Sequence, residues 1–248
     1  MTLGQVRSAS DSADEARVKR RAIHSWRAAS GGKPVTLIKD AERTQAEIIE
    51  VATQEFSTNG YSGGRVNEIA ARTRTSKRMI YYYFGSKEGL YRAVLKAHYQ
   101  ALRTQEQALR LDREPPVRAM RLLIQFTFDY HLDHADRIPL VMSENISRGV
   151  FINQPSIVEP LNGVALVDRI YARGVEEGAF RAGLRAVDIY MSIASASFFN
   201  VSNRYTFAAI FNHDMTEPAE VERRRAAIGE MILRYVAADP ANIDAGPA

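Results

Sequence analysis

Residues 57–86 read STNGYSGGRVNEIAARTRTSKRMIYYYFGS, and this stretch decides the fold. Apolar residues recur at helical spacing in two short segments, one on each side of the polar turn Thr73-Arg74-Thr75. The second segment is basic and aromatic. Two short helices joined by a tight turn are typical of a helix-turn-helix, whose second helix enters the major groove of DNA. The stretch therefore predicts a DNA-binding module.

A third apolar segment comes before this stretch. It is predicted to be a helix over residues 44–58, which Asn59-Gly60 ends. Each of the three segments carries an apolar stripe that it cannot bury alone, so we predict a small three-helix core. The stripe residues are Ile48, Ile49, Ala52 and Phe56 in the first segment, Val66, Ile69 and Ala70 in the second, and Ile80 and Phe84 in the third.

The side chains left outward on the third helix are hydrogen-bond donors and flat rings. They are Lys77, Arg78, Tyr81, Tyr82 and Tyr83, after Ser76 as the predicted helix cap. Basic side chains can reach guanine edges or phosphates, and tyrosine hydroxyls can donate to phosphates. Arg65 and Lys87 begin the neighbouring helices and would flank the groove. The alternative is a solvated charged face with tyrosines half-buried between helices.

Composition limits the class of protein. The chain has 248 residues, of which 46% are hydrophobic, enough to bury a core in one or two domains. The absence of cysteine excludes disulfides, thiolate zinc sites and cysteine nucleophiles. Residues 191–211 are too polar to span a membrane, and the charged start does not resemble a signal peptide. We therefore expect a soluble, cytoplasmic protein with no membrane partner.

Charge divides the chain into two parts. Residues 1–103 carry a net charge of +8 and the remaining residues −4. This asymmetry favours a polyanion-binding front part joined to a body that stays off the polyanion, although surface charge can also scatter in this way. We predict a flexible basic arm over residues 1–40, a helix-turn-helix domain over 41–86, a ligand-binding and dimerisation domain over 87–237 and a tail over 238–248.

The fold is predicted to be all-α, because the chain shows no strand alternation and no repeats. Further helices are expected over residues 86–109, from Pro115-Pro116 onward, and over residues 137–148, 156–177, 186–207 and 218–237. The basic residues of the arm are Arg17, Lys19, Arg20, Arg21 and Arg27. They either follow a minor groove or belong to a disordered extension.

The helix-turn-helix resembles a known family at specific residues. Gly60-Tyr61, Ile69-Ala70, Ser76-Lys77 and the run YYYFGSKE at 81–88 are similar to the signature of the tetracycline-repressor (TetR) family, over about residues 44–95. The resemblance implies an N-terminal three-helix domain that binds operator DNA as a dimer. It also implies a larger helical domain that binds a small ligand and then releases the DNA.

The resemblance also implies roles by position. Arg78, Met79 and Tyr81 are implied to contact bases, whereas Lys77, Tyr82, Tyr83 and Lys87 are implied to hold phosphates.

Five positions depart from the family pattern. Arg74 stands where the family has glycine, so we expect a left-handed backbone there at a cost of about 1 kcal/mol. Gly64-Arg65 replaces two small hydroxyl residues, which removes a helix cap and adds a cation. Met79 replaces threonine and Tyr83 replaces histidine. These changes affect the operator sequence rather than DNA binding itself.

Several phrases are similar to a subgroup of this family that includes a repressor of nicotinate degradation. They are residues 62–66 (SGGRV), 75–84 (TSKRMIYYYF), 202–207 (SNRYTF) and 144–145 (EN). This similarity favours the control of aromatic or heterocyclic catabolism over antibiotic efflux.

Aromatic, methionine and amide side chains on the later helices are candidates for a ligand pocket. Such residues at helical spacing are more often core than pocket. As a set, they would suit a flat, partly polar ligand. The candidates are Phe126, Tyr130, Met142, Asn145, Tyr171 and Phe199.

The last two predicted helices are candidate dimer faces. Small residues at 192 and 194–197 permit close helix approach, and the final helix has an apolar stripe of Ile228, Met231, Ile232 and Tyr235. The resemblance implies that these helices form a four-helix bundle between subunits. Twofold symmetry then predicts a pseudo-palindromic operator.

Enzyme classes are less well supported. His131 and His134 could suggest a metal site, but HExxH, ExxH and cysteine ligands are missing. No phosphate-binding glycine loop or G-x-S-x-G turn is present. We therefore expect a homodimeric, ligand-released repressor without catalytic residues, metal or cofactor. The alternatives are an activator of the same fold and a helical ligand-binding protein with a degenerate DNA-binding domain.

Overall fold

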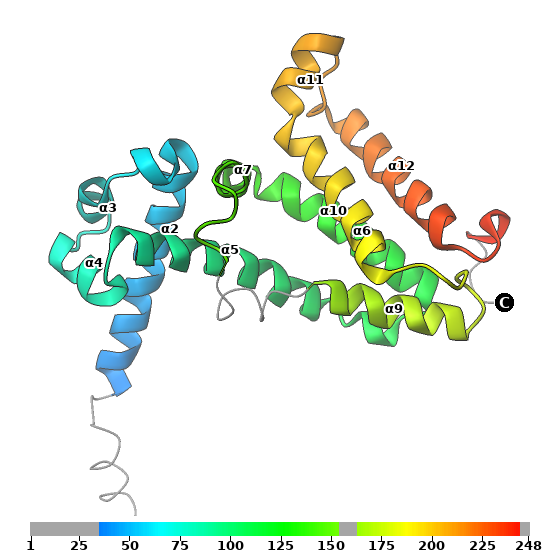
Figure 1. The fold of residues 1–248 in the computed structure, drawn as a ribbon, viewed down its shortest axis with the longest axis horizontal. Coiled ribbons are helices and arrows are strands. Elements are labelled where there is room, and N and C mark those ends of the chain that lie inside the picture. The colour runs from blue at the N-terminus through cyan, green and yellow to red at the C-terminus, as the bar shows by residue number, and fades with distance from the viewer. Residues whose placement is uncertain (1–34, 154–162, 244–248) are drawn as a thin grey trace, which may run out of the picture. The chain divides into compact units, whose positions relative to one another are not determined.

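The computed structural model describes residues 35–153 and 163–243 (Figure 1). Regular secondary structure in these ranges is helical, apart from an isolated antiparallel bridge between Phe180 and Ala237. The all-α prediction is therefore confirmed. The chain divides into two units, residues 1–46 and 47–248, and both hydrophobic clusters below lie in the second. Residues 1–34 of the predicted arm lie outside the described residues.

Three N-terminal helices form the predicted helix-turn-helix region. They are α2 (Val35–Gly63), α3 (Val66–Arg72) and α4 (Lys77–Phe84). Helix α2 is longer at both ends than the predicted 44–58. Gly60 breaks its regularity with a φ of 64°, so the expected end at Asn59-Gly60 corresponds to a kink. The first helix also includes residues 35–40, which the sequence assigned to the flexible arm.

The predicted three-helix core is present. Ile48, Ala52 and Phe56 of α2 are fully buried with Ile69 and Ile80, and Ile49, Ala70 and Phe84 pack against them half-buried. Helix α5 closes this core with the buried residues Leu90, Tyr91, Val94 and Leu95. The small domain therefore shares its core with the first half of α5.

The rest of the chain is a larger helical domain. Its helices are α5 (Lys87–Ala108), α6 (Pro116–Asp133), α7 (Ile138–Ile146), α9 (Val164–Glu176), α10 (Ala186–Ser202), α11 (Arg204–Phe211) and α12 (Pro218–Val236). Short 3-10 turns are η1 (Leu111–Arg113), η2 (Ala135–Arg137) and η4 (Pro240–Asn242). Ser86 caps α5, since its Oγ accepts a hydrogen bond from Gly89 N at 3.0 Å. The helix predicted over 186–207 is in fact two helices that meet at Asn203.

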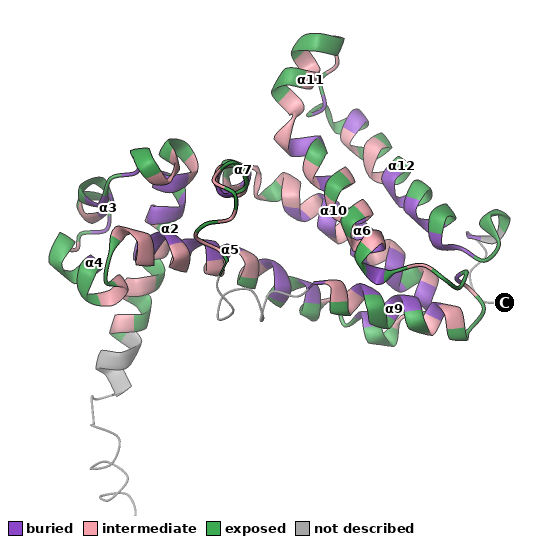
Figure 2. Cartoon of the chain, viewed as in Figure 1, coloured by how far each residue is buried: buried purple, intermediate pink, exposed green. Residues whose placement is uncertain are grey.

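Helices α6, α9, α10 and α12 pack around a second core, which includes Phe128, Val167, Ile189 and Ile232. This packing divides the predicted dimer stripe on α12. Ile228 and Ile232 are 1% exposed inside their own domain, whereas Met231 and Tyr235 are 55% and 40% exposed. Figure 2 shows both buried and exposed segments along α12. Only the second pair is free to meet another subunit.

The start of the predicted tail packs against this domain. Ile243 is buried, and its carbonyl accepts a hydrogen bond from Arg121 Nη2 at 3.1 Å. Ala238 N donates to the carbonyl of Ala179 at 3.0 Å. Residues 238–243 are thus part of the domain surface, contrary to the prediction of a tail.

Candidate nucleic-acid interface and ligand cavity

Helix α4 begins and ends at sequence-encoded signals. Ser76 precedes it with an extended backbone, and Ser76 Oγ accepts a hydrogen bond from Met79 N at 3.2 Å. Gly85 follows it with a φ of 75°, which a glycine adopts without steric cost. The predicted capping role of Ser76 is confirmed. These two signals fix an eight-residue helix with Ile80 pointing into the core.

The outward face of α4 carries most of the predicted DNA-binding side chains. Lys77 and Arg78 are exposed, and Met79, Tyr81 and Tyr82 are exposed large side chains. Tyr82 is 68% exposed, the most open of the three tyrosines. These five side chains, four of them hydrogen-bond donors and one apolar, therefore lie together on the solvent-facing surface of α4.

Tyr83 and Lys87 are placed differently. Tyr83 is half-buried and packs against the N-terminal core, so the alternative of a tyrosine between helices describes this residue. Lys87 donates from Nζ to the carbonyl of Ser62 at 3.2 Å and lies 4.9 Å from the centre of the Tyr61 ring. Both residues border the outward face, and both have structural contacts of their own.

The turn between α3 and α4 contains the expected strained residue. Arg74 has a φ of 52°, in the left-handed region that favours glycine. Thr73 beside it is buried, and its Oγ1 donates to the carbonyl of Ile69 at 2.8 Å. The turn is therefore held by a threonine side chain where the family pattern uses glycine flexibility.

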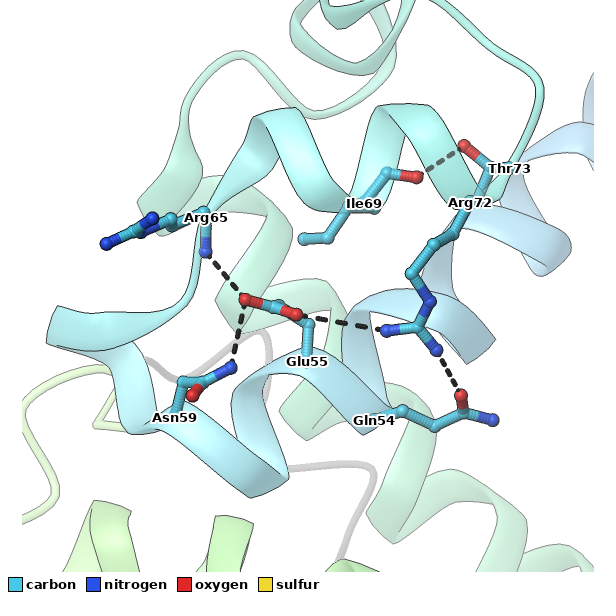
Figure 3. Close-up of polar contacts among 7 residues, drawn as sticks. All are labelled: Gln54, Glu55, Asn59, Arg65, Ile69, Arg72 and Thr73. Carbon is cyan, nitrogen blue, oxygen red and sulfur yellow. Dashed lines mark hydrogen bonds and ion pairs between the residues drawn. The ribbon is translucent and has the colours of Figure 1, made fainter.

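The helix cap that Arg65 cannot provide comes from another helix. Arg65 makes no side-chain cap of α3, but its backbone N donates to Oε1 of Glu55 at 3.0 Å (Figure 3). The same oxygen accepts from Asn59 Nδ2 at 3.0 Å, and Arg72 Nη1 lies 3.8 Å from Oε2. A buried carboxylate at this helix N-terminus also complements the helix dipole. Glu55 thus ties α2 to both ends of α3, a role that sequence reasoning missed.

A cavity of about 380 Å³ lies in the larger domain, between α5, α6, α7 and α10. Its walls combine aromatic and aliphatic side chains with a few polar groups, as ligand sites commonly do. The lining residues are His98, Tyr99, Leu102, Arg103 and Glu106 from α5, Thr127 and His131 from α6, Val141 and Asn145 from α7, and Tyr190, Ala194, Ser195 and Phe198 from α10.

An ion pair lies in the cavity wall. Arg103 Nη1 pairs with Glu106 Oε2, and Arg103 Nη2 donates to the Tyr190 hydroxyl at 3.1 Å. Both charged side chains are buried, and Arg103 Nε has no hydrogen-bond partner among the described residues. Burial raises the pKa of Glu106 from 4.5 to about 7, and the charge of Arg103 opposes this rise.

Two histidines of the cavity are neutral at physiological pH. Burial, assisted by the charge of Arg137, lowers the pKa of His98 to about 4. Burial and the neighbouring His134 lower the pKa of His131 to about 4. The wall thus offers uncharged imidazoles and the hydrogen-bonded pair of Arg103 and Glu106, so it suits a ligand with a few hydrogen-bonding groups.

The structure does not bring the six predicted ligand-binding residues together. Asn145 lines the cavity, and its Nδ2 donates to the carbonyl of Val141 at 2.9 Å. Tyr171 lies in the core, where its hydroxyl donates to the carbonyl of Arg181 at 2.8 Å and accepts from Leu184 N at 2.9 Å. Met142 and Phe199 face solvent, because they lie on the outer sides of their helices.

Tyr130 and Phe126 form a separate contact. The Tyr130 ring is buried 4.2 Å from the ring of His134 and 5.8 Å from that of Phe126. Of the six predicted residues, Asn145 lines this cavity, and α5 supplies lining side chains that the sequence prediction did not name. Tyr99, Arg103 and Glu106 recur one turn apart, and this polar face of α5 was the available signal.

A second hollow, of about 560 Å³, is lined by Glu106 and by residues of η1 and α9. Its wall includes the exposed residues Arg110, Asp112 and Arg169, and the wall of the first cavity includes the exposed residues Asn145 and Ser195, so both spaces are open to solvent. The second hollow shares only Glu106 with the first cavity.

A capped basic helix on a three-helix core, followed by a helical domain with a cavity, defines a helix-turn-helix transcriptional regulator with a sensing domain. Residues 48–94 match the family model for bacterial regulatory proteins of the tetR family, and residues 116–232 match the tetracyclin repressor-like C-terminal domain. The chain belongs to the TetR family and is a DNA-binding transcriptional regulator. The predicted family is thus confirmed.

Individual relatives agree with this assignment. The chain is 32% identical over 198 residues to the HTH-type transcriptional repressor NicS of Pseudomonas putida, covering 79% of this chain and 93% of the relative. It is 29% identical over 161 residues to the HTH-type transcriptional repressor SCO4008 of Streptomyces coelicolor, covering 64% and 80%. The crystal structure of the regulator SCO4942 from Streptomyces coelicolor shares the fold, with a TM-score of 0.59 and 24% identity over 79% of this chain and 99% of that one.

Proposed function

We propose that this protein is a homodimeric repressor that leaves a pseudo-palindromic operator when an aromatic or heterocyclic molecule binds the cavity between α5, α6, α7 and α10. The observation that carries the proposal is the double role of α5. Its first half contributes Tyr91 and Leu95 to the helix-turn-helix core, and its second half contributes Tyr99, Arg103 and Glu106 to the cavity wall. A ligand that moves α5 therefore moves the base of the DNA-binding domain.

The DNA contacts are proposed from the outward face of α4. Arg78, Met79 and Tyr81 read bases, and Lys77 and Tyr82 hold phosphates, because all five are exposed and adjacent. Arg65 extends this surface from the start of α3. Tyr83 and Lys87 add phosphate contacts at its border, and Ser76 supports the helix start.

The ligand class follows from the cavity wall. Leu102, Val141 and Phe198 supply apolar surface, while Tyr99 and Asn145 are among its polar groups. A flat ring fits between such walls, and ring nitrogens, hydroxyls or carbonyl groups can bond to the neutral histidines. This class of effector agrees with the sequence similarity to the subgroup described above.

The dimer interface is proposed on α10 and α12. Val187, Met191 and Phe199 share one face of α10 with Ser195 and are 46%, 60% and 45% exposed. With Met231 and Tyr235 they form an exposed apolar surface of the kind that subunit association covers. The interface is thus the exposed part of the predicted stripes.

Repression is favoured over activation by the relatives. NicS and SCO4008 are both named repressors, whereas FasR of Mycolicibacterium smegmatis, 27% identical over 185 residues, is named an activator. We also propose a cytoplasmic location, because the proposed partner is operator DNA. No helix of the described residues combines the length and hydropathy needed to cross a membrane.

The proposal is tested by displacement from DNA. A duplex selected from a random pool for binding to this protein is titrated with a panel of aromatic and heterocyclic compounds, and release is followed by fluorescence anisotropy. At least one compound should release the wild type, and Phe198→Ala should need a concentration at least about tenfold higher, since an apolar cavity wall is lost. Phe211→Ala, at a 62% exposed site on α11, should respond like the wild type. Release that is indifferent to Phe198 would reject this cavity.

A further inference from the structure

Helix α7 lies between the cavity and the DNA-binding domain. Val141 and Asn145 line the cavity, whereas Leu140, one residue away from Val141, is fully buried in the N-terminal core. A Cβ placed on Gly60 at the kink of α2 would lie 3.4 Å from Ser143 Oγ. The same short helix therefore contacts both the cavity space and the helix-turn-helix domain.

Four aromatic rings join these parts, and we call them the aromatic cluster: Phe56 and Tyr61 from α2, Tyr91 from α5, and Phe151 from the turn after α7. The centre of the Phe151 ring lies 4.2 Å from that of Tyr61 and 5.1 Å from that of Tyr91. Tyr61 and Tyr91 are 5.2 Å apart, and Tyr91 meets Phe56 edge-on at 5.1 Å. Phe151 is thus in ring contact with two helices of the DNA-binding core.

Glu144 fixes Phe151 to α7. The Glu144 side chain is 3% exposed, and its Oε1 accepts hydrogen bonds from Phe151 N at 2.8 Å and Ile152 N at 3.0 Å. Gly149 N donates to the Glu144 carbonyl at 2.9 Å. Buried hydrogen bonds to a carboxylate are strong, so the turn moves with α7 as one piece. Burial and the charge of Glu144 also raise the pKa of Tyr91 to about 12, so its hydroxyl stays neutral.

We infer that Phe151, held by Glu144, is the positioning residue that passes occupancy of the cavity to the DNA-binding domain. The inference rests on the proposed ligand-released function. A ligand that displaces Val141 and Asn145 carries Phe151 with α7, and Phe151 then displaces the Tyr61 ring. Lys87 Nζ lies over that ring and donates to the Ser62 carbonyl, so the shift reaches the border of the DNA-binding surface. Packed rings transmit small shifts because close-packed contacts cannot deform continuously.

The absence of cysteine permits a test without the natural ligand. Asn145→Cys places a thiol in the cavity wall of an otherwise thiol-free chain, and N-benzylmaleimide then attaches an aromatic group there. Ile146→Cys is the matched control, because Ile146 is the next residue of α7 and is exposed like Asn145, but does not line the cavity. The readout is the Kd for a duplex selected from a random pool, before and after labelling, with Phe151 intact or replaced by alanine.

Labelling at position 145 should raise the Kd at least about tenfold with Phe151 intact and less than about twofold in Phe151→Ala, within the usual range of coupling between sites. Labelling at position 146 should change neither protein. Glu144→Ala should lose the response while keeping all four rings, and Glu144→Gln should keep it, since its amide oxygen can still accept both N–H groups. If Phe151→Ala does not fold, the two Glu144 variants test the role of Phe151 in its place.

The two possible failures differ. An equal rise of Kd with and without the Phe151 ring, and with Glu144→Ala, would overturn the role of Phe151 and leave the ligand-released function intact. No rise in any labelled protein would show that the DNA-binding domain does not respond to this cavity, and the proposed function would fail together with the inference.

Discussion

At the scale of single residues, side chains of the DNA-binding domain stabilise a helix start and a turn where the family's usual cap and glycine residues are absent. Glu55 caps α3 in place of the hydroxyl residue that position 65 lacks, and Thr73 holds a turn in which Arg74 takes a glycine-like φ of 52°. The Arg74 conformation followed from sequence, because handedness is a local property of the backbone. The Glu55 cap did not, since its acceptor lies ten residues from the donor and depends on how α2 packs on α3.

Removal of the Glu55 carboxylate should destabilise the N-terminal domain. Glu55→Ala leaves Arg65 N and Asn59 Nδ2 without their acceptor, so we expect the free energy of unfolding to fall by about 1–2 kcal/mol. Urea titration measures the change. Glu47→Ala, at an exposed site on the same helix, should cost less than about 0.5 kcal/mol. Equal losses for the two variants would argue against the cap.

Relief of the turn strain should have the opposite effect. Arg74→Gly removes the left-handed Cβ penalty and should raise the free energy of unfolding by about 0.5–1 kcal/mol. Arg65→Gly is the comparison, because Arg65 has a φ of −118° and gains nothing from glycine. A thermal melt of both variants measures the difference. A lower melting temperature for Arg74→Gly would contradict the strain.

At the scale of elements, the ends of helices could be predicted from the sequence, whereas the face of each helix that packs inward could be predicted only in part. Ser76 and Ser86 mark the starts of α4 and α5 because a serine cap acts within three residues. The ligand pocket was predicted from residues on α6, α7, α9 and α10, whereas α5 lines the cavity together with α6, α7 and α10. Which face of α5 is enclosed depends on the packing of α6, α7 and α10, and the spacing of its own residues does not contain that information.

The cavity histidines should make stability depend on acid. The pKa of His131 falls from 6.5 in the unfolded chain to about 4 in the folded domain, so its contribution is fully present above pH 6.5 and is lost as the pH falls toward 4. We expect the free energy of unfolding of the wild type to fall by about 1–3 kcal/mol between pH 6.5 and pH 4 because of His131. His131→Phe should not show this loss, since phenylalanine is aromatic but cannot titrate.

Glu106 has the opposite effect on stability. Its pKa is 4.5 in the unfolded chain and about 7 in the folded domain, so its contribution to stability grows as the pH falls from 7 to 4.5. This contribution is present in the wild type and in His131→Phe. Urea titration of both proteins at each pH measures their free energies of unfolding. The difference between the two values isolates the contribution of His131. Parallel curves from pH 7 to pH 4 would be incompatible with a buried neutral His131.

At the scale of the whole molecule, the proposed function requires association of two chains. The apolar side chains Val187, Met191 and Phe199 of α10 and Met231 and Tyr235 of α12 are 40% to 60% exposed in the single chain, and a twofold reader would need two copies of α4. Family membership followed from the helix-turn-helix alone, because that signature is local. Two residues of the predicted dimer stripe, Ile228 and Ile232, face their own core, while Met231 and Tyr235 stay a prediction.

A charge on this surface should separate the subunits. Met191→Glu places a carboxylate at a 60% exposed site on α10, and we expect sedimentation to show a monomer whose Kd for the selected duplex is at least about 100-fold higher. Ile146→Glu, at an 80% exposed site on α7, should remain a dimer. A dimeric Met191→Glu protein with unchanged DNA affinity would move the interface elsewhere.

DNA recognition by α4 is tested by the binding of the selected duplex and of a scrambled duplex at several salt concentrations, with and without Arg78→Ala. Binding is followed by fluorescence anisotropy. We predict tight, sequence-selective binding that weakens steeply with salt, together with loss of selectivity in Arg78→Ala. Weak binding that ignores sequence, salt and the mutation would contradict DNA recognition by α4. That result would favour a helical ligand-binding protein with a degenerate DNA-binding domain.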